Sequence, residues 1–360
     1  MNSITSHSKE VFETLLGGTS AIDQTGLDIE SLTQAYAFAK SYGYDLNDSD
    51  DLERVWFFHR KSVALLRDKI LLEDESLPVE LTDPAALQDI GNLFIKASRS
   101  NPDREIQKWA CALLRAMHVF AHTNNDVFYQ FHDVIQEQVL ADFRQHITND
   151  PTAGVKIGGI HQSESIYLSK YEIKPFKGTN SAVIKLLAKP YSLSINLMDK
   201  LGIRFVTKDI YDSFRVARYL VNSHLICFAN IMPDQSRNTV FPLNLLFEVL
   251  ESVSSDLSNE EMQSLLDKKL ESSAHRAEYL EKRNDFSAEQ FKFIKFIARK
   301  LVEIEGPSGN FRFFFPFEIQ IVDQKTYQDN LTGPGAHEEY KKRQLEAARR
   351  RLLGQKKDRT

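Results

Sequence analysis

The feature that most constrains the fold is an apolar run near the C-terminal end, FFFPFEIQIVD (Phe313–Asp323). Aromatic and β-branched residues dominate this run, which predicts a buried strand that pairs with neighbours in a sheet. Glu318 and Gln320 lie two positions apart inside it, so their side chains point to the same face of the sheet. Because desolvating a carboxylate is costly, Glu318 is expected to face a basic partner or a polar site.

The composition fits a soluble globular chain of about two domains, with 360 residues, 42% hydrophobic and 26% charged. The formal net charge of −5 gives no sign of a polyanion-binding protein, although nine Lys or Arg residues lie between Lys341 and Arg359. Cys111 and Cys227 lack metal-site spacing and are expected to be buried thiols. No stretch approaches about 18 apolar residues and no signal pattern opens the chain, so a cytoplasmic location without membrane contact is expected.

Residues 1–150 predict an all-helical N-terminal domain. Apolar residues recur at helical spacing there, and residues typical of helix caps flank the segments. Asp28 or Ser31 is the expected start of the first helix, and Gly43 is its expected end. Further helical segments are expected to begin at Ser49, Pro84, Pro102 and Asn125.

Residues 151–342 predict a mixed domain. Alternating β-branched residues between Gly154 and Phe176 predict a hairpin, and LGIRFVTK (Leu201–Lys208) predicts a short strand. Helices are expected between the strands, over an insertion at about 254–304, and in a basic C-terminal tail, 343–360. The predicted fold class is therefore α+β, a mixed sheet flanked by helices and preceded by the all-helical domain.

Acidic residues on the predicted strands could carry chemistry. Asp199 stands just before the short strand and Glu318 lies within the last one, so the two carboxylates could hold Mg²⁺ against the phosphates of a nucleotide. Lysines and a hydroxyl at a helix start could neutralise those phosphates; these are Lys174, Lys177, Ser181 and Lys185. A structural interpretation stays open, in which Glu318 pairs with Arg204 or another base and the lysines are solvated.

Four motifs occur in order along the mixed domain: SAVIK (Ser181–Lys185), DKLGIRFV (Asp199–Val206), EIQIV (Glu318–Val322) and GPGAHEEYK (Gly333–Lys341). This succession resembles the synthetase domain of RelA/SpoT-type proteins, the alarmone synthetases of the stringent response, with their SIxxK, DxxxxR, EIQI and AHxxYK patterns. His337 follows Glu318 by nineteen residues, the family's usual interval. The resemblance implies a nucleotidyltransferase-like fold over about 155–342.

The activity that the resemblance implies is Mg²⁺-dependent pyrophosphate transfer from ATP to the 3′-hydroxyl of a nucleotide or an RNA end. It implies that Asp199 and Glu318 are the catalytic acids: Asp199 would hold the metal, and Glu318 would share it or draw the proton from the hydroxyl. The residues it implies at the ATP phosphates are Lys174, Lys177, Ser181, Lys185 and Arg204. Those implied on the acceptor side are Gln320, Arg237 and His337.

The chain departs from the family pattern at the acceptor. The family's aromatic GYxSxH stretch, which stacks the guanine base, corresponds to Phe228–Leu246. This segment has no Gly and no Tyr, so Arg237, Asn238 and Phe241 are the evident substitutes. Lys174 lies beside a position where the family has Arg, and Lys lacks the planar fork of a guanidinium. An alternative is therefore a catalytically inactive, nucleotide-binding regulatory protein on the same fold. A third reading is a nucleotidyltransferase that moves a nucleoside monophosphate and releases pyrophosphate.

Two further features have alternative interpretations. His118 and His122 lie at i, i+4 with Asp126 four residues on, a spacing that can chelate a metal, although packed histidines are the commoner case. The basic tail could contact RNA or an acidic partner, or it could form a solvated helix that frays.

Overall fold

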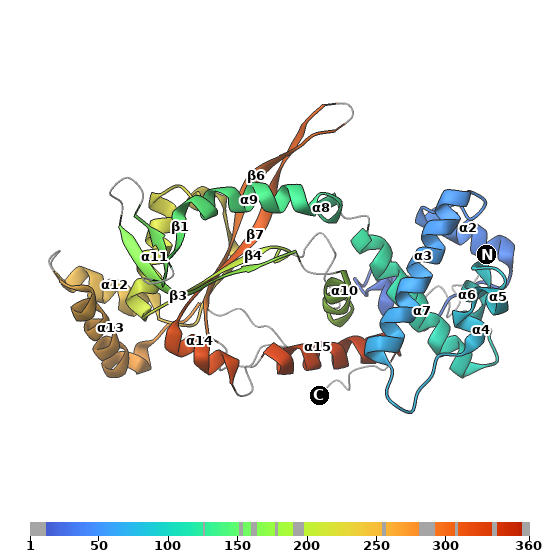
Figure 1. The fold of residues 1–360 in the computed structure, drawn as a ribbon. Helices are drawn as coiled ribbons and strands as arrows, with labels where there is room; N and C mark the ends of the chain where they lie inside the picture. The colour runs from blue at the N-terminus through green and yellow to red at the C-terminus, as the bar shows by residue number, and fades with distance from the viewer. Residues whose placement is uncertain are drawn as a thin grey trace. The chain divides into compact units, whose positions relative to one another are not determined.

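The computed structural model describes residues 12–124, 127–150, 154–159, 164–176, 179–189, 198–253, 257–280, 292–306, 309–332 and 337–354. The chain forms two compact units. The first, here the helical unit, comprises Met1–Gln130, Gly178–Asn196 and Lys342–Thr360. The second, here the sheet unit, comprises Phe131–Lys177 and Leu197–Lys341. The positions of the two units relative to one another are not determined (Figure 1).

The helical unit confirms the helices expected before residue 130. Its helices are α2 (Leu32–Tyr42), α3 (Ser49–Leu65), α4 (Val79–Thr82), α5 (Pro84–Leu87), α6 (Gly91–Lys96), α7 (Arg104–Asn124), α8 (Val127–Gln130) and α10 (Thr179–Ala188). The Ser31 side chain accepts a hydrogen bond from the N–H of Gln34 and so caps α2, which ends at Gly43 with a positive φ of 120°. The predicted caps of this helix are therefore confirmed.

The core of the helical unit forms around α7, which packs against α3, α6 and α10. Trp109 and Phe120 on α7 are 2% and 1% exposed. SAVIK, the first motif, thus lies on a helix that packs in this unit, whereas the sequence places it in the mixed domain. The unit boundary also falls at residue 130 rather than at 150.

The C-terminal helix α15 (His337–Leu352) corrects the expectation of a fraying tail. Ala348 and Leu352 are fully buried. Arg349 contacts both carboxylate oxygens of Glu75, at 2.8 and 2.7 Å, and Arg351 pairs with Asp23. Two of the tail's basic residues are therefore neutralised within the helical unit, and these two are not free to contact RNA.

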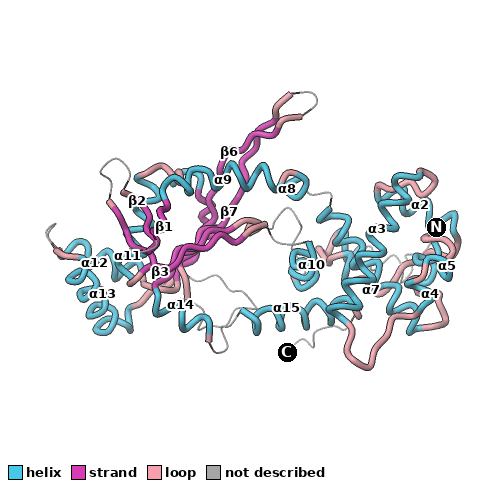
Figure 2. Tube along the Cα trace, in the orientation of Figure 1, coloured by secondary structure: helices cyan, strands magenta, loops and turns pink. Residues whose placement is uncertain are grey.

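The sheet unit contains a seven-stranded sheet in the order β1-β2-β3-β4-β7-β6-β5. Figure 2 draws its strands in magenta. The strands are β1 (Ile147–Asp150), β2 (Gly154–Gly158), β3 (Ser165–Lys174), β4 (Gly202–Thr207), β5 (Ile231–Asn238), β6 (Ile294–Ile304) and β7 (Phe311–Asp323). Within this sheet β4 and β7 pair in parallel and the other pairs are antiparallel. The predicted α+β class, with a mixed sheet flanked by helices, is confirmed.

The helix predicted at the end of the insertion, toward residue 304, is wrong, because residues 294–304 form β6. All eleven residues of β6 pair with β7, from Ile294 opposite Ile321 to Ile304 opposite Phe311. The apolar residues of this segment suit helical and strand spacing alike, and pairing with the neighbouring strand decides between them. Among the described residues between 254 and 304, α13 (Asn259–Ser273) is the α-helix that agrees with the predicted helical insertion.

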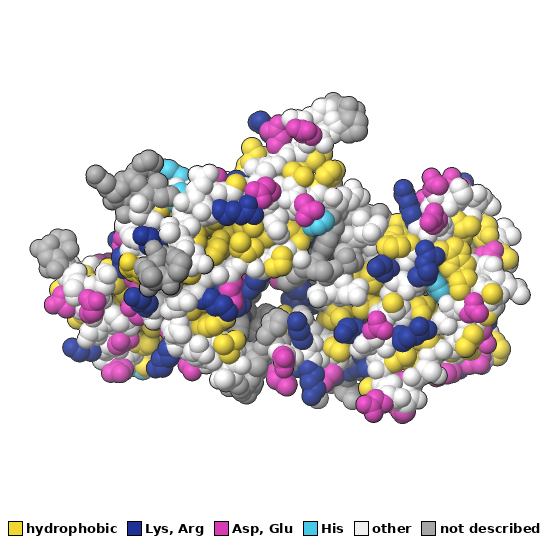
Figure 3. All heavy atoms as spheres, in the orientation of Figure 1, with side chains coloured by type: hydrophobic (Ala, Val, Ile, Leu, Met, Phe, Trp, Pro, Cys, Tyr) yellow, Lys and Arg dark blue, Asp and Glu magenta, His cyan; other side chains and the backbone are white. Residues whose placement is uncertain are grey.

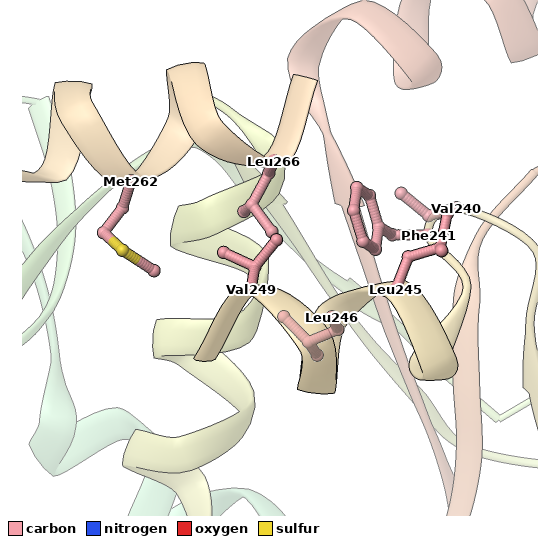
Figure 4. Close-up of a cluster of buried hydrophobic side chains, with 7 residues drawn as sticks. All are labelled: Val240, Phe241, Leu245, Leu246, Val249, Met262 and Leu266. Atoms are coloured by element: carbon pink, nitrogen blue, oxygen red, sulfur yellow. The ribbon is translucent and has the colours of Figure 1, made fainter. Parts of the chain in front are cut away.

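Helices cover the sheet and form a second apolar cluster at its β5 end. They are α9 (His132–His146), α11 (Ile210–Asn222), α12 (Leu243–Ser252), α13 and α14 (Gln324–Leu331). Asp209 caps α11 by accepting the N–H of Asp212, as predicted. Phe143 on α9 meets Phe317 of β7, with ring centroids 6.1 Å apart, so α9 covers the sheet face opposite Glu318. Seven side chains on and near α12 and α13 form the cluster shown in Figure 4.

Candidate functional site

Two neighbouring rows of side chains cross the sheet on the face opposite α9. The strand register sets one row as Lys174, Gly202 and Glu318. The second row lies two positions along each strand and therefore points to the same face. Its members are Glu172, Arg204, Gln320, Lys295 and Arg237.

Glu318 is buried between two lysines. Glu318 is only 5% exposed to solvent. Lys174 Nζ lies 3.3 Å from Oε1, and Lys295 Nζ lies 2.9 Å from Oε2. The expected basic partner of Glu318 is thus present, and two ammonium groups rather than Arg204 provide it. Such pairing offsets the cost of burying the carboxylate.

Gly202 lies beneath the contact between Lys174 and Glu318. It lies between them in the register, on β4. A Cβ at position 202 would lie 3.4 Å from Cδ of Lys174 and 3.7 Å from Cβ of Glu318. These are ordinary van der Waals distances, so the Lys174 side chain crosses β4 directly above Gly202 on its way to Glu318.

Gln320 connects the lysine pair to Arg204. Its amide oxygen accepts a hydrogen bond from Lys174 Nζ at 2.6 Å and from Arg204 Nε and Nη2 at 3.1 and 3.0 Å. Arg204 Nη1 donates to Glu172 Oε2 at 3.0 Å. The site is therefore a continuous charged network in which hydrogen bonds and ion pairs hold Lys174, Arg204 and Lys295.

Glu172 and Tyr327 complete the network, and the sequence analysis did not single out either. Burial raises the pKa of Glu172, but bonds and charge from Lys170 and Arg204 outweigh it, so the pKa is lowered overall. Tyr327 Oη donates to Glu172 at 3.3 Å, and Lys170 and Arg204 both lie over the Tyr327 ring. The sequence signal that could have identified Glu172 is its position two residues before Lys174 on the same predicted strand.

The remaining predicted site residues are spread over the chain. Asp199 lies in the turn before β4, three residues before Gly202. Arg237 lies on β5 opposite Lys295, with its guanidinium 5.1 Å from the centroid of Phe293. Ser181 and Lys185 lie on α10, in the helical unit. Lys177 falls outside the described residues, and His337 begins α15 but has no described side chain.

The acceptor substitutes expected from the sequence are partly corrected. Phe241 is fully buried in the cluster of Figure 4, so its ring cannot stack on a base. Asn238 is 8% exposed, and its side chain bonds to main-chain atoms of Phe241. Both residues are structural. Cys227, expected to be buried, is exposed, whereas Cys111 is buried as predicted.

The chemistry of the donor set bears on a metal at this face. Among the described residues no group of three or more His, Cys, Asp and Glu could hold an ion. Mg²⁺ commonly takes one or two carboxylates and completes its shell with phosphates and water. Lysine ammonium groups lie at both oxygens of Glu318, and in this arrangement the carboxylate does not fit a metal ligand. The assignment of Asp199 and Glu318 to Mg²⁺ stays a prediction.

The histidine pair of α7 packs against an aromatic side chain. The rings of His118 and His122 lie 4.5 Å apart, and Tyr42 Oη is 2.9 Å from His118 Nδ1. Burial, followed by the neighbouring His122, lowers the pKa of His118 to about 4. Asp126, the third predicted ligand, lies outside the described residues. The described contacts thus fit packed, neutral histidines.

This lowered pKa predicts a loss of stability in mild acid. The unfolded chain protonates His118 near its ordinary value of 6.5 and the folded chain only near 4, so the unfolded state binds more protons between these values. The contribution is complete above pH 6.5 and is lost as the pH falls toward 4, by up to about 3 kcal/mol. Urea unfolding from pH 7 to pH 4.5 measures it. His118→Gln should flatten the slope, while His275→Gln, at an exposed position, should keep it; equal slopes in all three chains would contradict the assignment.

Comparisons with known proteins give weak similarities. No family model and no curated protein matches the chain. The small alarmone synthetase 1 from Bacillus subtilis, bound to its product pppGpp, is similar with 12% identity and a TM-score of 0.28, covering 62% of this chain and 86% of that chain. A GTP pyrophosphokinase family protein from Streptococcus pneumoniae gives 13% identity, the same TM-score, and coverage of 62% and 87%. At these values the similarities decide neither fold nor activity.

No described helix is both long and apolar enough to cross a bilayer.

Proposed function

We propose that this face of the sheet binds the polyphosphate of ATP and transfers pyrophosphate to the 3′-hydroxyl of a nucleotide or an RNA end. The observation that supports it most is the register, which aligns Arg204, Gln320, Lys295 and Arg237 on four neighbouring strands beside Glu318. Several cations gathered at one place suit this reaction, because phosphoryl transfer depends on positioning and on charge stabilisation. The order of the sequence motifs supports the same chemistry.

Arg237 is the next cation of the row, opposite Lys295, and in this proposal it serves the acceptor side. Its Nε is buried and has no hydrogen-bond partner among the described residues. A buried donor without a partner is costly, and a phosphate oxygen would satisfy it. We therefore place a phosphate group of the nucleotides near Arg237 and Lys295.

Glu318 has the role of proton acceptor in this proposal. The triphosphate carries more negative charge than one carboxylate, so it would draw Lys174 and Lys295 away from Glu318. The freed carboxylate would then accept the proton of the 3′-hydroxyl while the oxygen of that hydroxyl bonds to the β-phosphorus. The bond from the β-phosphorus to the oxygen bridging it to the α-phosphate breaks, and AMP leaves with that oxygen. Mg²⁺ would arrive with ATP as part of the substrate.

A second candidate is nucleotide binding without catalysis. One observation favours it: both oxygens of Glu318 are held by lysines in a residue that is 5% exposed. If the lysines stay in place when nucleotide binds, no base is available. This candidate predicts that ATP raises the melting temperature without any product.

The test is ATP turnover with a labelled γ-phosphate and with GDP, GTP, other nucleotides or tRNA as acceptors. We expect AMP and labelled acceptor in equal amounts. Arg204→Gln should lower kcat/KM at least tenfold, because it removes a charged bond to the transferred group. Arg312→Gln is the matched control, since Arg312 pairs with Glu303 on the exposed β6–β7 hairpin and should leave turnover unchanged. The proposal would be contradicted if AMP formed without any labelled acceptor, or if no AMP formed under any condition. Release of pyrophosphate would indicate nucleotidyl transfer.

A further inference from the structure

The helical unit contains an apolar cavity that the proposed reaction does not use. Its volume is about 380 Å³. For comparison, an apolar cavity of about 150 Å³ is enough to bind benzene, and ligand pockets typically measure about 300–1,000 Å³. Phe38 and Tyr42 of α2 line the cavity and are each 40% exposed, so a ligand reaches it from the surface at this helix. Figure 3 shows hydrophobic side chains gathered at the surface of the helical unit as well.

Aromatic rings form much of the cavity wall, and they pack edge-on against one another. Phe38 meets Phe94 with ring centroids 5.7 Å apart, and Tyr44 meets Phe58 with ring centroids 5.8 Å apart. All four residues line the cavity. Met117 lines it as well, and a thioether sulfur makes favourable contacts with aromatic rings. A planar aromatic ligand therefore finds ring edges and a polarizable sulfur to pack against.

The polar side chains of the wall are engaged within the protein. Tyr42 Oη lies 2.9 Å from His118 Nδ1, and the Cys111 thiol donates to the main-chain oxygen of Ala97 at 3.3 Å. Some buried side-chain nitrogen and oxygen atoms of the described residues lack a hydrogen-bond partner, but none of these atoms belongs to the cavity wall. A ligand in the cavity therefore has no orphaned polar group of the wall to satisfy.

Arg115, a cation in this wall, is engaged in the same way. Both of its terminal nitrogens donate to main-chain oxygens, those of Leu352 and Gln24. Leu352 is the last residue of α15, and the end of a helix carries partial negative charge, so the guanidinium is balanced within the fold. His118 is neutral at pH 7, because burial lowers its pKa to about 4. An ionised ligand would leave water for a wall whose cation is already engaged, which is costly.

We propose that this cavity binds a neutral aromatic molecule, which packs among the rings of the wall and forms no ion pair with it. The driving force is the removal of the ligand's apolar surface from water, and a wall that is formed before binding lowers the ordering cost. All the residues that carry this proposal belong to the helical unit. The proposal therefore holds whether or not the sheet unit transfers pyrophosphate.

The experiment compares two fluorescent probes that have the same rings. N-phenyl-1-naphthylamine is neutral, and 8-anilinonaphthalene-1-sulfonate carries an added sulfonate. Both become brighter in apolar surroundings, so each is titrated with the full chain at pH 7. We expect saturable binding of one neutral probe per chain and at least tenfold weaker binding of the sulfonate. Binding of the sulfonate as tight as that of the neutral probe would overturn the neutral class of ligand, and no saturable binding of the neutral probe would overturn the site.

A matched pair of variants places the bound probe. Ala39 lines the cavity and is 4% exposed, so Ala39→Phe adds a ring inside it. Ala37 lies on the same helix at an exposed position, so Ala37→Phe is the control. In chains that keep the wild-type circular dichroism, binding of the neutral probe should fall at least tenfold in the first variant and stay unchanged in the second. Unchanged binding in a folded Ala39→Phe chain would overturn the proposal. If that variant does not fold, the two-probe comparison on the unaltered chain still decides.

Discussion

Replacing Glu318 by Gln is expected to reduce pyrophosphate transfer at least a hundredfold while the chain stays folded. Gln keeps the shape of the side chain and can accept a hydrogen bond through its oxygen, but it cannot take up the proton of the 3′-hydroxyl. A positioned general base typically contributes about 10²–10⁴-fold to a rate. The loss should appear in kcat, because ATP phosphates would still meet Lys174, Lys295 and Arg204.

The stability of this variant should change less than its rate. The substitution leaves two ammonium groups without their shared carboxylate, but the side chains of Lys174 and Lys295 are 34% and 25% exposed. Because both can turn toward water, we expect a loss of about 1–3 kcal/mol in the free energy of unfolding, measured with urea. A change of that size keeps a typical domain folded at 25 °C.

Glu303→Gln provides the control for this prediction. Glu303 also lies on the sheet and also pairs with a cation, Arg312, at 2.7 Å, but it belongs to the exposed part of the β6–β7 hairpin. Its replacement should leave AMP formation within twofold of the unaltered chain. Equal rates for the Glu318 and Glu303 variants would remove Glu318 from the chemistry, and the lysine contacts would then be structural only.

The sequence was sufficient to predict the part of the site that lies on β4 and β7. Strand alternation placed Glu318 and Gln320 on one face, and the strand Gly202–Thr207 was predicted as well. The register that sets Arg204 opposite Gln320 depends on non-local pairing, which periodicity alone does not contain. The expectation of a basic partner for Glu318 is confirmed because desolvation makes such a partner necessary in any fold.

Lys295 could not be found from the sequence, because its segment was predicted as a helix. On a helix its side chain would have no fixed relation to Glu318. Once β7 pairs with this segment, Lys295 lies opposite Gln320 and reaches the neighbouring row. Tertiary pairing therefore decided both the secondary structure and a site residue. The division into units also escaped the sequence, since α10 packs on α7 across a long stretch of chain.

Phe241 shows how a motif comparison can select a core residue. Its place in the stretch corresponding to the family's acceptor loop suggested a base-stacking role. In the structure it is fully buried and meets Phe214 edge-on, with ring centroids 5.9 Å apart. It packs with Leu245 and Val249 in the cluster of Figure 4. The ring therefore stabilises the junction of β5 and α12, and it presents no surface to a nucleotide.

Phe241→Ala is accordingly expected to lower the free energy of unfolding by about 3–5 kcal/mol, because it removes a buried ring and leaves a cavity. Phe247→Ala is the matched control: Phe247 lies on α12 but is 55% exposed, so its loss should stay within about 0.5 kcal/mol. Urea unfolding of both variants gives the two values. If Phe241 stacked on a base instead, its replacement would weaken acceptor binding with little change in stability. The two accounts thus predict opposite patterns in the same pair of variants, and a stable Phe241→Ala chain with impaired acceptor binding would reverse the assignment made from burial.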